Sequence, residues 1–168
     1  MAATLVIRPV TATDLPAIGA FIGDLGYTSR REALLAMLGP MLEDRRYLLL
    51  KGESDGLGVV ALMSLSSRPV LRLQGWVGTI EELAVRAEAR NLGFGGQMLQ
   101  YAKGLAAERG WVRLESVITR RRESHRRGFL LERGFVQADS ATYRWGLLEG
   151  RYPIPPVLDP YGRAGELV

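Results

Sequence analysis

The segment from Trp76 to Ile118 limits the possible folds of this chain more than any other part of the sequence. Trp76 to Val85 predicts a strand because it holds apolar and β-branched residues, and a glycine-punctuated loop follows from Arg90 to Gly96. A stripe of apolar residues then predicts a helix that ends at Gly110, and Val112 to Ile118 alternates as a further strand. A strand, a helix and a strand in this order form a parallel crossover, so the sheet must contain at least one parallel pair.

The rest of the chain predicts elements in an order that is typical of an α+β protein. The apolar spacing and the turn residues predict a strand over Thr4–Val10, helices from Asp14 and from about Ser29, a break or kink at Gly39-Pro40, strands over Arg46–Lys51 and Leu57–Ser66, a turn around Ser67–Pro69, a basic helix over Arg121–Arg133 and a strand over Phe135–Leu148. The order β-αα-βββ-α-β-α-β predicts a mixed, mostly antiparallel central sheet flanked by helices in three layers.

Length and proline content predict one domain with a tail. The 168 residues suit a single hydrophobic core, and we expect the domain to cover residues 1–148. Residues 149–168 hold four of the eight prolines, so we expect a proline-rich tail there.

Composition excludes several classes of function. The chain has no cysteine and one histidine, so we expect no disulfide, no thiolate nucleophile and no metal site. No apolar run approaches the ~20 residues of a membrane helix, and the start of the chain lacks the pattern of a signal peptide. We therefore expect a cytoplasmic protein without a membrane partner. The net charge of +4 favours an anionic ligand without implying nucleic acid.

The glycine-punctuated loop has the properties of an anion site. The first turn of a helix leaves backbone N–H groups without internal partners, and the helix dipole adds partial positive charge there. Glycine lets a ligand approach that backbone closely, so the loop suits a phosphate or pyrophosphate, with Arg90 at its rim. The alternative is that the glycines only turn the chain and begin the helix. No Gly-Lys-Ser/Thr follows, so the loop is not a P-loop.

A family resemblance adds to this interpretation. Arg90-x-x-Gly93-x-Gly95 resembles the Arg/Gln-x-x-Gly-x-Gly/Ala pyrophosphate motif of the GNAT N-acetyltransferases. The run Ile80-Glu-Glu-Leu-Ala-Val85 is similar to the fourth strand of that family, and Gly134-Phe135 resembles the dipeptide after its last helix. The resemblance covers about Leu5 to Trp145 in the family's order.

The resemblance implies that acetyl-CoA is the co-substrate and that a primary amine of a small molecule or peptide attacks its thioester directly. A strand-like pairing of the pantetheine arm is implied for Leu83, Ala84 and Val85, and the next strand is expected to diverge and leave a cleft. Contacts to the rest of CoA, chiefly its pyrophosphate, are implied for Arg90, Asn91, Leu92, Gly93, Phe94, Gly95, Gly96 and Ser124. Family members are frequently dimers, so a homodimer is a further expectation.

Glu81 and Glu82 are the candidates for a general base, since attack requires a neutral amine. Neighbours on a regular strand face opposite ways, but the family often has a bulge here, so both stay candidates and we favour Glu81. The alternative is that they are ordinary solvent-facing charges. The chain departs from the family at Leu130, which replaces a tyrosine that acts as general acid toward the thiolate.

Other residues and functions were left open by the sequence. The basic run from Arg120 to Arg127 has two interpretations, a contact with the 3′-phosphate of CoA or a solvated helix face. Possible acceptor-lining residues are Tyr27, Arg30, Arg31 and Trp76. The departure at Leu130 favours an alternative function, a non-catalytic acyl-CoA-binding module. Nucleic-acid binding is least favoured because the basic run has no interleaved aromatic residues.

Overall fold

The computed structural model describes residues 4–25, 30–118 and 123–140. The chain divides into two units, Met1–Gly134 and Phe135–Val168. In the second unit, residues 135–140 form neither helix nor strand, so the strand predicted from Phe135 is wrong for these residues. The remainder of that strand and the expected boundary after residue 148 lie outside the described residues.

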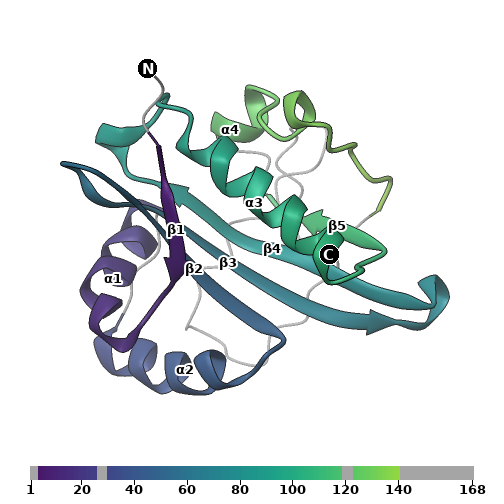
Figure 1. The fold of residues 1–168 in the computed structure, drawn as a ribbon, viewed down its shortest axis with the longest axis horizontal. Helices are drawn as coiled ribbons and strands as arrows, with labels where there is room; N and C mark the ends of the chain where they lie inside the picture. Colours follow the sequence, from purple (N-terminus) through teal and green to yellow (C-terminus); the bar gives the residue numbers. More distant parts are fainter. Residues whose placement is uncertain (1–3, 26–29, 119–122, 141–168) are drawn as a thin grey trace, which may run out of the picture. The chain divides into compact units, whose positions relative to one another are not determined.

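The first unit is built on a five-stranded sheet (Figure 1). The strands lie in the order of the sequence: β1 (Val6–Pro9), β2 (Tyr47–Ser54), β3 (Gly58–Val70), β4 (Gly75–Val85) and β5 (Arg113–Ser116). The pairs from β1 to β4 are antiparallel, and β4 pairs with β5 in parallel. The fold class is confirmed, including the single parallel crossover.

Helices cover both faces of the sheet (Figure 1). Helices α1 (Leu15–Asp24) and α2 (Arg31–Glu43) pack with Leu62 of β3 in one core cluster. Side chains alternate along a strand, so the fully buried Met63 faces the other side, where α3 (Phe94–Glu108) lies against β3 and β4. Both faces of the central strands are therefore buried.

Proline departs from its expected effect at two places. Helix α2 continues through Gly39-Pro40, because Pro40 removes one backbone donor near the helix end and Asp44 N still donates to Pro40 O at 3.1 Å. Strand β3 continues through the turn predicted around Pro69, which pairs with Trp76 of β4. Pairing with β2 ends at Ser66, so Pro69 has no ladder on that side to interrupt.

The basic helix predicted over Arg121–Arg133 is wrong in its extent. The described part has a short helix, α4 (Glu123–Arg126), and a 3-10 turn at Leu131–Arg133. Gly128 ends α4 with a left-handed φ of 67°, Gly128 N donates to His125 O, and Phe129 N donates to Ser124 O. These two bonds form a Schellman motif, which closes a helix at a glycine.

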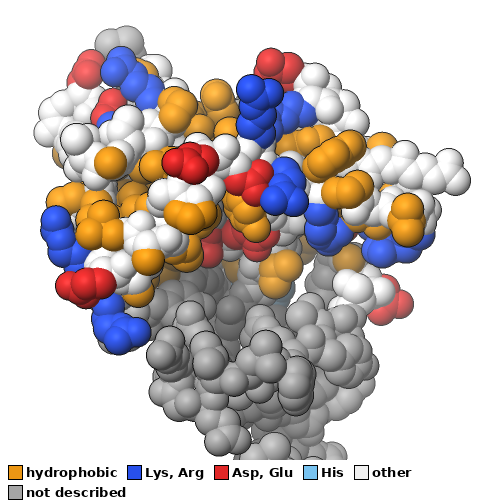
Figure 2. All heavy atoms as spheres, turned by 90° about the horizontal axis from the view of Figure 1, so that it is seen from below, with side chains coloured by type: hydrophobic (Ala, Val, Ile, Leu, Met, Phe, Trp, Pro, Cys, Tyr) orange, Lys and Arg blue, Asp and Glu red, His pale blue; other side chains and the backbone are white. Residues whose placement is uncertain are grey.

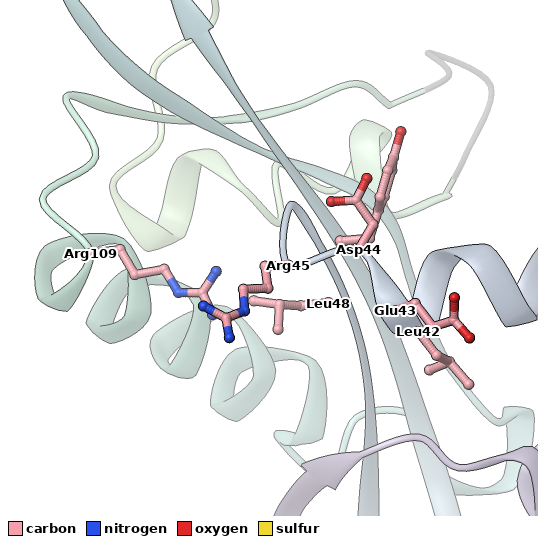
Figure 3. Close-up of a pocket in the computed structure, with 7 residues that line it drawn as sticks. Leu42, Glu43, Asp44, Arg45, Leu48 and Arg109 are labelled. Carbon is pink, nitrogen blue, oxygen red and sulfur yellow. The ribbon is translucent and has the colours of Figure 1, made fainter.

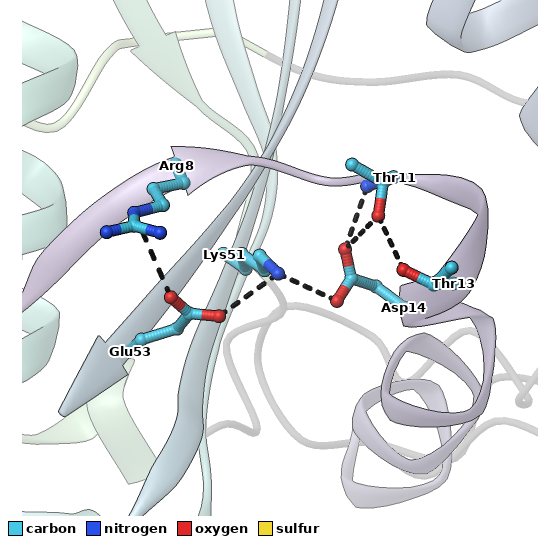
Figure 4. A network of polar contacts seen from close by, with 6 residues as sticks. All are labelled: Arg8, Thr11, Thr13, Asp14, Lys51 and Glu53. Carbon is cyan, nitrogen blue, oxygen red and sulfur yellow. Dashed lines mark hydrogen bonds and ion pairs between the residues drawn. The ribbon is translucent and has the colours of Figure 1, made fainter. Parts of the chain in front are cut away.

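A polar network joins the start of α1 to strands β1 and β2 (Figure 4). Lys51 Nζ lies 2.8 Å from an Asp14 carboxylate oxygen and 3.0 Å from one of Glu53, and Arg8 lies 4.0 Å from Glu53. Burial raises the pKa of Asp14, but hydrogen bonds from Lys51 and Thr11 outweigh that effect and hold the pKa below its usual value. The hydrogen bond to Asp14, and then that to Glu53, raises the pKa of Lys51.

Asp14→Asn should lower the melting temperature by about 1–3 °C at pH 7, since solvent screens an ion pair near the surface. A carboxylate with a lowered pKa stabilises the fold above its unfolded pKa, near 3.9, and loses this contribution as the pH falls through the folded pKa. The difference in melting temperature between Asp14→Asn and wild type should therefore decrease below about pH 4. Thermal melts against pH measure it, with Glu108→Gln, an exposed carboxylate on α3, as the control. A difference that persists at pH 2 would contradict the assignment.

Candidate active site

A β-bulge places two carboxylates on the same face of strand β4. Ser64 pairs with Glu82 and Leu65 pairs with Ile80, so Glu81 is an extra residue in β4. Such an extra residue interrupts the alternation of side chains. Ser64 Oγ donates to Glu82, and Ser66 Oγ donates to Glu81 Oε1. Because the two serines are two residues apart on β3 and share a face, both carboxylates lie on that face.

The edge of β4 toward β5 becomes open beyond the bulge. The parallel ladder ends where Ile80 pairs with Ser116, whereas β4 runs on to Val85. Arg86 N donates to Val60 O, so by alternation the backbone groups of Ala84 face β3 and those of Leu83 and Val85 face the opening. The predicted divergence of the two strands is confirmed.

Helix α3 begins beside this opening. Gly93 precedes the helix with a left-handed φ of 87°, which glycine adopts without strain, and Gln97 N donates to Gly93 O at 3.1 Å. The N–H groups of Phe94, Gly95 and Gly96 come before this first helical bond, so they have no partner within the helix. The result is a row of donors at the positive end of the helix dipole.

Phe129 and Arg133 pack against the first turn of α3. A Cβ on Gly95 would lie 3.0 Å from Phe129 Cζ, and one on Gly96 would lie 3.3 Å from Arg133 Nε. The Arg133 guanidinium lies 4.0 Å from the centroid of the Phe129 ring, and its Nη1 donates to Phe129 O at 3.0 Å. The two glycines therefore provide the space in which an aromatic ring and a guanidinium approach the helix start.

Two more arginines lie around this helix start. Arg90 Nε donates to Val85 O at 3.3 Å, and Arg127 Nη1 donates to Asn91 Oδ1 at 3.3 Å. Asn91 has a left-handed φ of 64°, a conformation that asparagine tolerates better than most residues. Arginines from three segments thus surround the donors of α3.

One cavity of about 690 Å³ joins these features. On one face of the sheet, the cavity is lined by the start of α3 and by Arg133. On the other face, it is lined by Glu81, Glu82 and the end of α1. The cavity therefore crosses the sheet where β4 and β5 separate. Its lining is formed by Asp24, Leu25, Glu81, Glu82, Leu83, Ala84, Val85, Ala89, Arg90, Asn91, Gly93, Phe94, Gly95, Gly96, Ser116, Val117, Ile118, Ser124, Arg127, Phe129, Leu130, Glu132 and Arg133.

The cavity brings together every residue that the sequence assigned to the site except Leu92, whose side chain is exposed and lies outside the lining. Leu130 lines the cavity, so its side chain offers no proton donor there. Asp24, Phe129 and Arg133 were missed by the sequence analysis. The only sequence signal for Arg133 is its place directly before Gly134-Phe135.

The cavity lining contains none of the described residues that the sequence suggested for binding the acceptor. Arg30, Arg31 and Trp76 do not line the cavity, and Tyr27 lies outside the described residues. Asp24 and Leu25, at the end of α1, line it instead.

A second hollow of about 540 Å³ shares no residue with the first (Figure 3). It is lined by the end of α2, the start of β2 and Arg109 at the end of α3. The side chains of Arg45 and Arg109 point toward one another in Figure 3. None of the residues assigned from the sequence lies in this second hollow.

Among the described residues, no group of three or more His, Asp and Glu is arranged to hold a metal ion. No helix in the described ranges is long and apolar enough to cross a membrane. On the face of the molecule shown in Figure 2, acidic side chains gather near the middle, among apolar and basic ones.

Comparison with known proteins identifies the family. The profile of the Acetyltransferase (GNAT) family matches residues 23–135, which include both ends of the cavity. The chain belongs to the GNAT acetyltransferase family. This GNAT protein is 30% identical over 138 residues to an aminoalkylphosphonate N-acetyltransferase of Salmonella typhimurium, which covers 79% of this chain and 85% of the relative.

Solved structures agree in fold. An aminoglycoside antibiotic 6′-N-acetyltransferase from Acinetobacter haemolyticus aligns with a TM-score of 0.70 at 18% identity, over 86% of this chain and 99% of its own. A transcriptional regulator from Bacillus halodurans C-125 aligns with a TM-score of 0.75 at 21% identity, over 85% and 99%. The family and the curated relative make this GNAT protein an acyl-CoA-dependent N-acyltransferase, and they give no support to the non-catalytic alternative.

Gly95→Val should lower the free energy of unfolding by about 1–3 kcal/mol, because the added atoms overlap the Phe129 ring. The control is Gly104→Ala on the same helix, where a Cβ meets nothing within 4 Å and should raise that free energy by about 0.5–1 kcal/mol. Urea denaturation measures both. If Gly95→Val were as stable as wild type, the packing of Phe129 on α3 would be wrong.

Proposed function

We propose that this enzyme moves the acetyl group of acetyl-CoA to the primary amine of a small molecule by direct attack. The proposal rests chiefly on the cavity that crosses the sheet between β4 and β5. One end of the cavity has arginines and helix N–H groups without a partner in the helix, and the other end has Asp24, Glu81 and Glu82. An anionic coenzyme fits the first end and an amine fits the second.

The start of α3 supports binding of the CoA pyrophosphate. The N–H groups of Phe94, Gly95 and Gly96 offer donors, and the helix dipole favours negative charge. Arg133 lies at the positive end of the helix, where a cation is unfavourable by about 0.3–1 kcal/mol, and its ion pair with Glu132 at 3.4 Å is exposed to solvent on the Glu132 side. A bound diphosphate would add an anionic partner for Arg133 at this end. Arg90 and Arg127 line the same end and supply further positive charge.

The open edge of β4 supports binding of the pantetheine arm. The amides of the arm extend this edge in the manner of an added strand, with the backbone groups of Leu83 as partners. Val85 O already accepts a hydrogen bond from Arg90, so its N–H is the group left for a ligand. An N–H of Leu83 or Val85 would also stabilise the negative charge that develops on the thioester oxygen.

Glu81 is the proposed general base, with Glu82 as its neighbour. The base takes one proton from the amine, directly or through water, as the nitrogen forms a bond to the carbonyl carbon. The carbon–sulfur bond then breaks, and the sulfur leaves as a thiolate. Leu130 cannot supply a proton to it. A thiolate is a workable leaving group without an acid, because the pKa of a thiol is near ~8.5.

The acceptor enters at the end that Asp24, Glu81 and Glu82 line. The name of the relative makes aminoalkylphosphonates the first compounds to assay, and an aminoglycoside and a peptide amine complete the panel. Location in the cytoplasm and a homodimer remain parts of the proposal, each tested separately by fractionation and by light scattering.

Arg133→Gln should raise the Kd for acetyl-CoA about tenfold, since a hydrogen bond to a charged group contributes about 1.5–3 kcal/mol and this side chain is partly exposed. Arg72→Gln, beyond the end of β3 and outside the cavity lining, should leave the Kd unchanged. Calorimetry with acetyl-CoA and free CoA measures both. The absence of binding by any CoA thioester to the wild type would refute the proposed function.

Glu81→Gln should lower kcat about a hundredfold, because the amide cannot accept the proton, while KM for acetyl-CoA stays within about twofold. Glu108→Gln should keep wild-type kinetics. Steady-state assays with the best acceptor of the panel measure these constants. Full turnover by Glu81→Gln together with loss in Glu82→Gln would move the role of base to Glu82.

A further inference from the structure

The two carboxylates of the bulge are held by hydroxyl groups in different surroundings. Ser64 is 4% exposed and its hydroxyl donates to Glu82, whereas Ser66 is half-buried and its hydroxyl donates to Glu81. Each serine has one proton to give, and each gives it to one carboxylate on the neighbouring strand.

Burial separates the functions of the two bonds. A buried hydroxyl is destabilising without a hydrogen-bond partner, so the bond to Glu82 satisfies the hydroxyl of Ser64 in the interior. Ser66 is open to water and does not need Glu81 for this reason. The bond from Ser66 fixes Glu81 through Oε1, while Oε2 has no hydrogen bond to the part of the chain that the structure describes.

We propose that Ser66 is a positioning residue that orients the general base Glu81 toward the acceptor amine. The inference rests on the proposed function, because it concerns the same carboxylate. The bulge brings Glu81 onto the face of Ser66, and the hydroxyl holds one oxygen so that the other points into the cavity. Ser64 and Glu82 form the matched pair that anchors the strand.

Removing the hydroxyl lets the Glu81 carboxylate turn away from the amine, and this effect gives the test. Ser66→Ala should lower kcat about three- to tenfold, while KM for acetyl-CoA stays within about twofold, because the hydrogen bond acts on the base and not on the coenzyme. Ser66→Thr keeps the hydroxyl and should restore kcat.

Steady-state assays with the best acceptor of the panel measure kcat and KM for each variant. An unchanged kcat in Ser66→Ala, or a loss that Ser66→Thr does not restore, overturns the proposal.

A double variant tests whether Ser66 acts through Glu81. Adding Ser66→Ala to Glu81→Gln should lower kcat no further, because the carboxylate that the hydroxyl holds is already absent. A further loss of about three- to tenfold in the double variant overturns the proposal. Failure of the proposed function has a different signature, since the wild type would then transfer no acetyl group.

Discussion

The end of the parallel pairing between β4 and β5 determines the rest of the site. The ladder stops at Ile80 and Ser116, and beyond it the outward backbone groups of β4 have no partner strand among the residues that the structure describes. A continuous ladder would satisfy those groups within the sheet and close the passage from one face to the other. The candidate binding surface therefore depends on the separation of the two strands, and the side chains around it add charge and hydrogen-bonding groups.

The two faces of the sheet hold different chemistry because the passage joins them. The face covered by α3 contributes helix donors and arginines, and the face covered by α1 and α2 contributes carboxylates. A coenzyme that is anionic at one end and reactive at the other could therefore lie with its anionic end near the arginines and its reactive end near the carboxylates. In the proposed function, this separation keeps the basic groups that would hold the phosphates away from the amine that must lose a proton.

Local pattern was enough to predict the fold class, the crossover and the loop before α3. Helix periods, alternation and the glycines of the loop are all properties of neighbouring residues. The bulge at Glu81 could not be derived in this way, since it depends on the register between β3 and β4. The roles of Phe129 and Arg133 arise from tertiary packing on Gly95 and Gly96. The prediction of a long basic helix was wrong because Gly128, in a left-handed conformation, ends the helix within a run of helix-forming residues.

The continuation of β3 past its pairing with β2 also affects the behaviour of the protein at high concentration. Beyond Ser67, whose N–H donates to Arg46 O, the strand has no partner on the side of β2 among the described residues, and strands of other molecules can add to an edge of this kind. Pro69 stands within this edge, and an imide has no hydrogen to offer to an incoming strand. Pro69, which the sequence predicts to lie in a turn, therefore disfavours the addition of a further strand at the end of the hairpin.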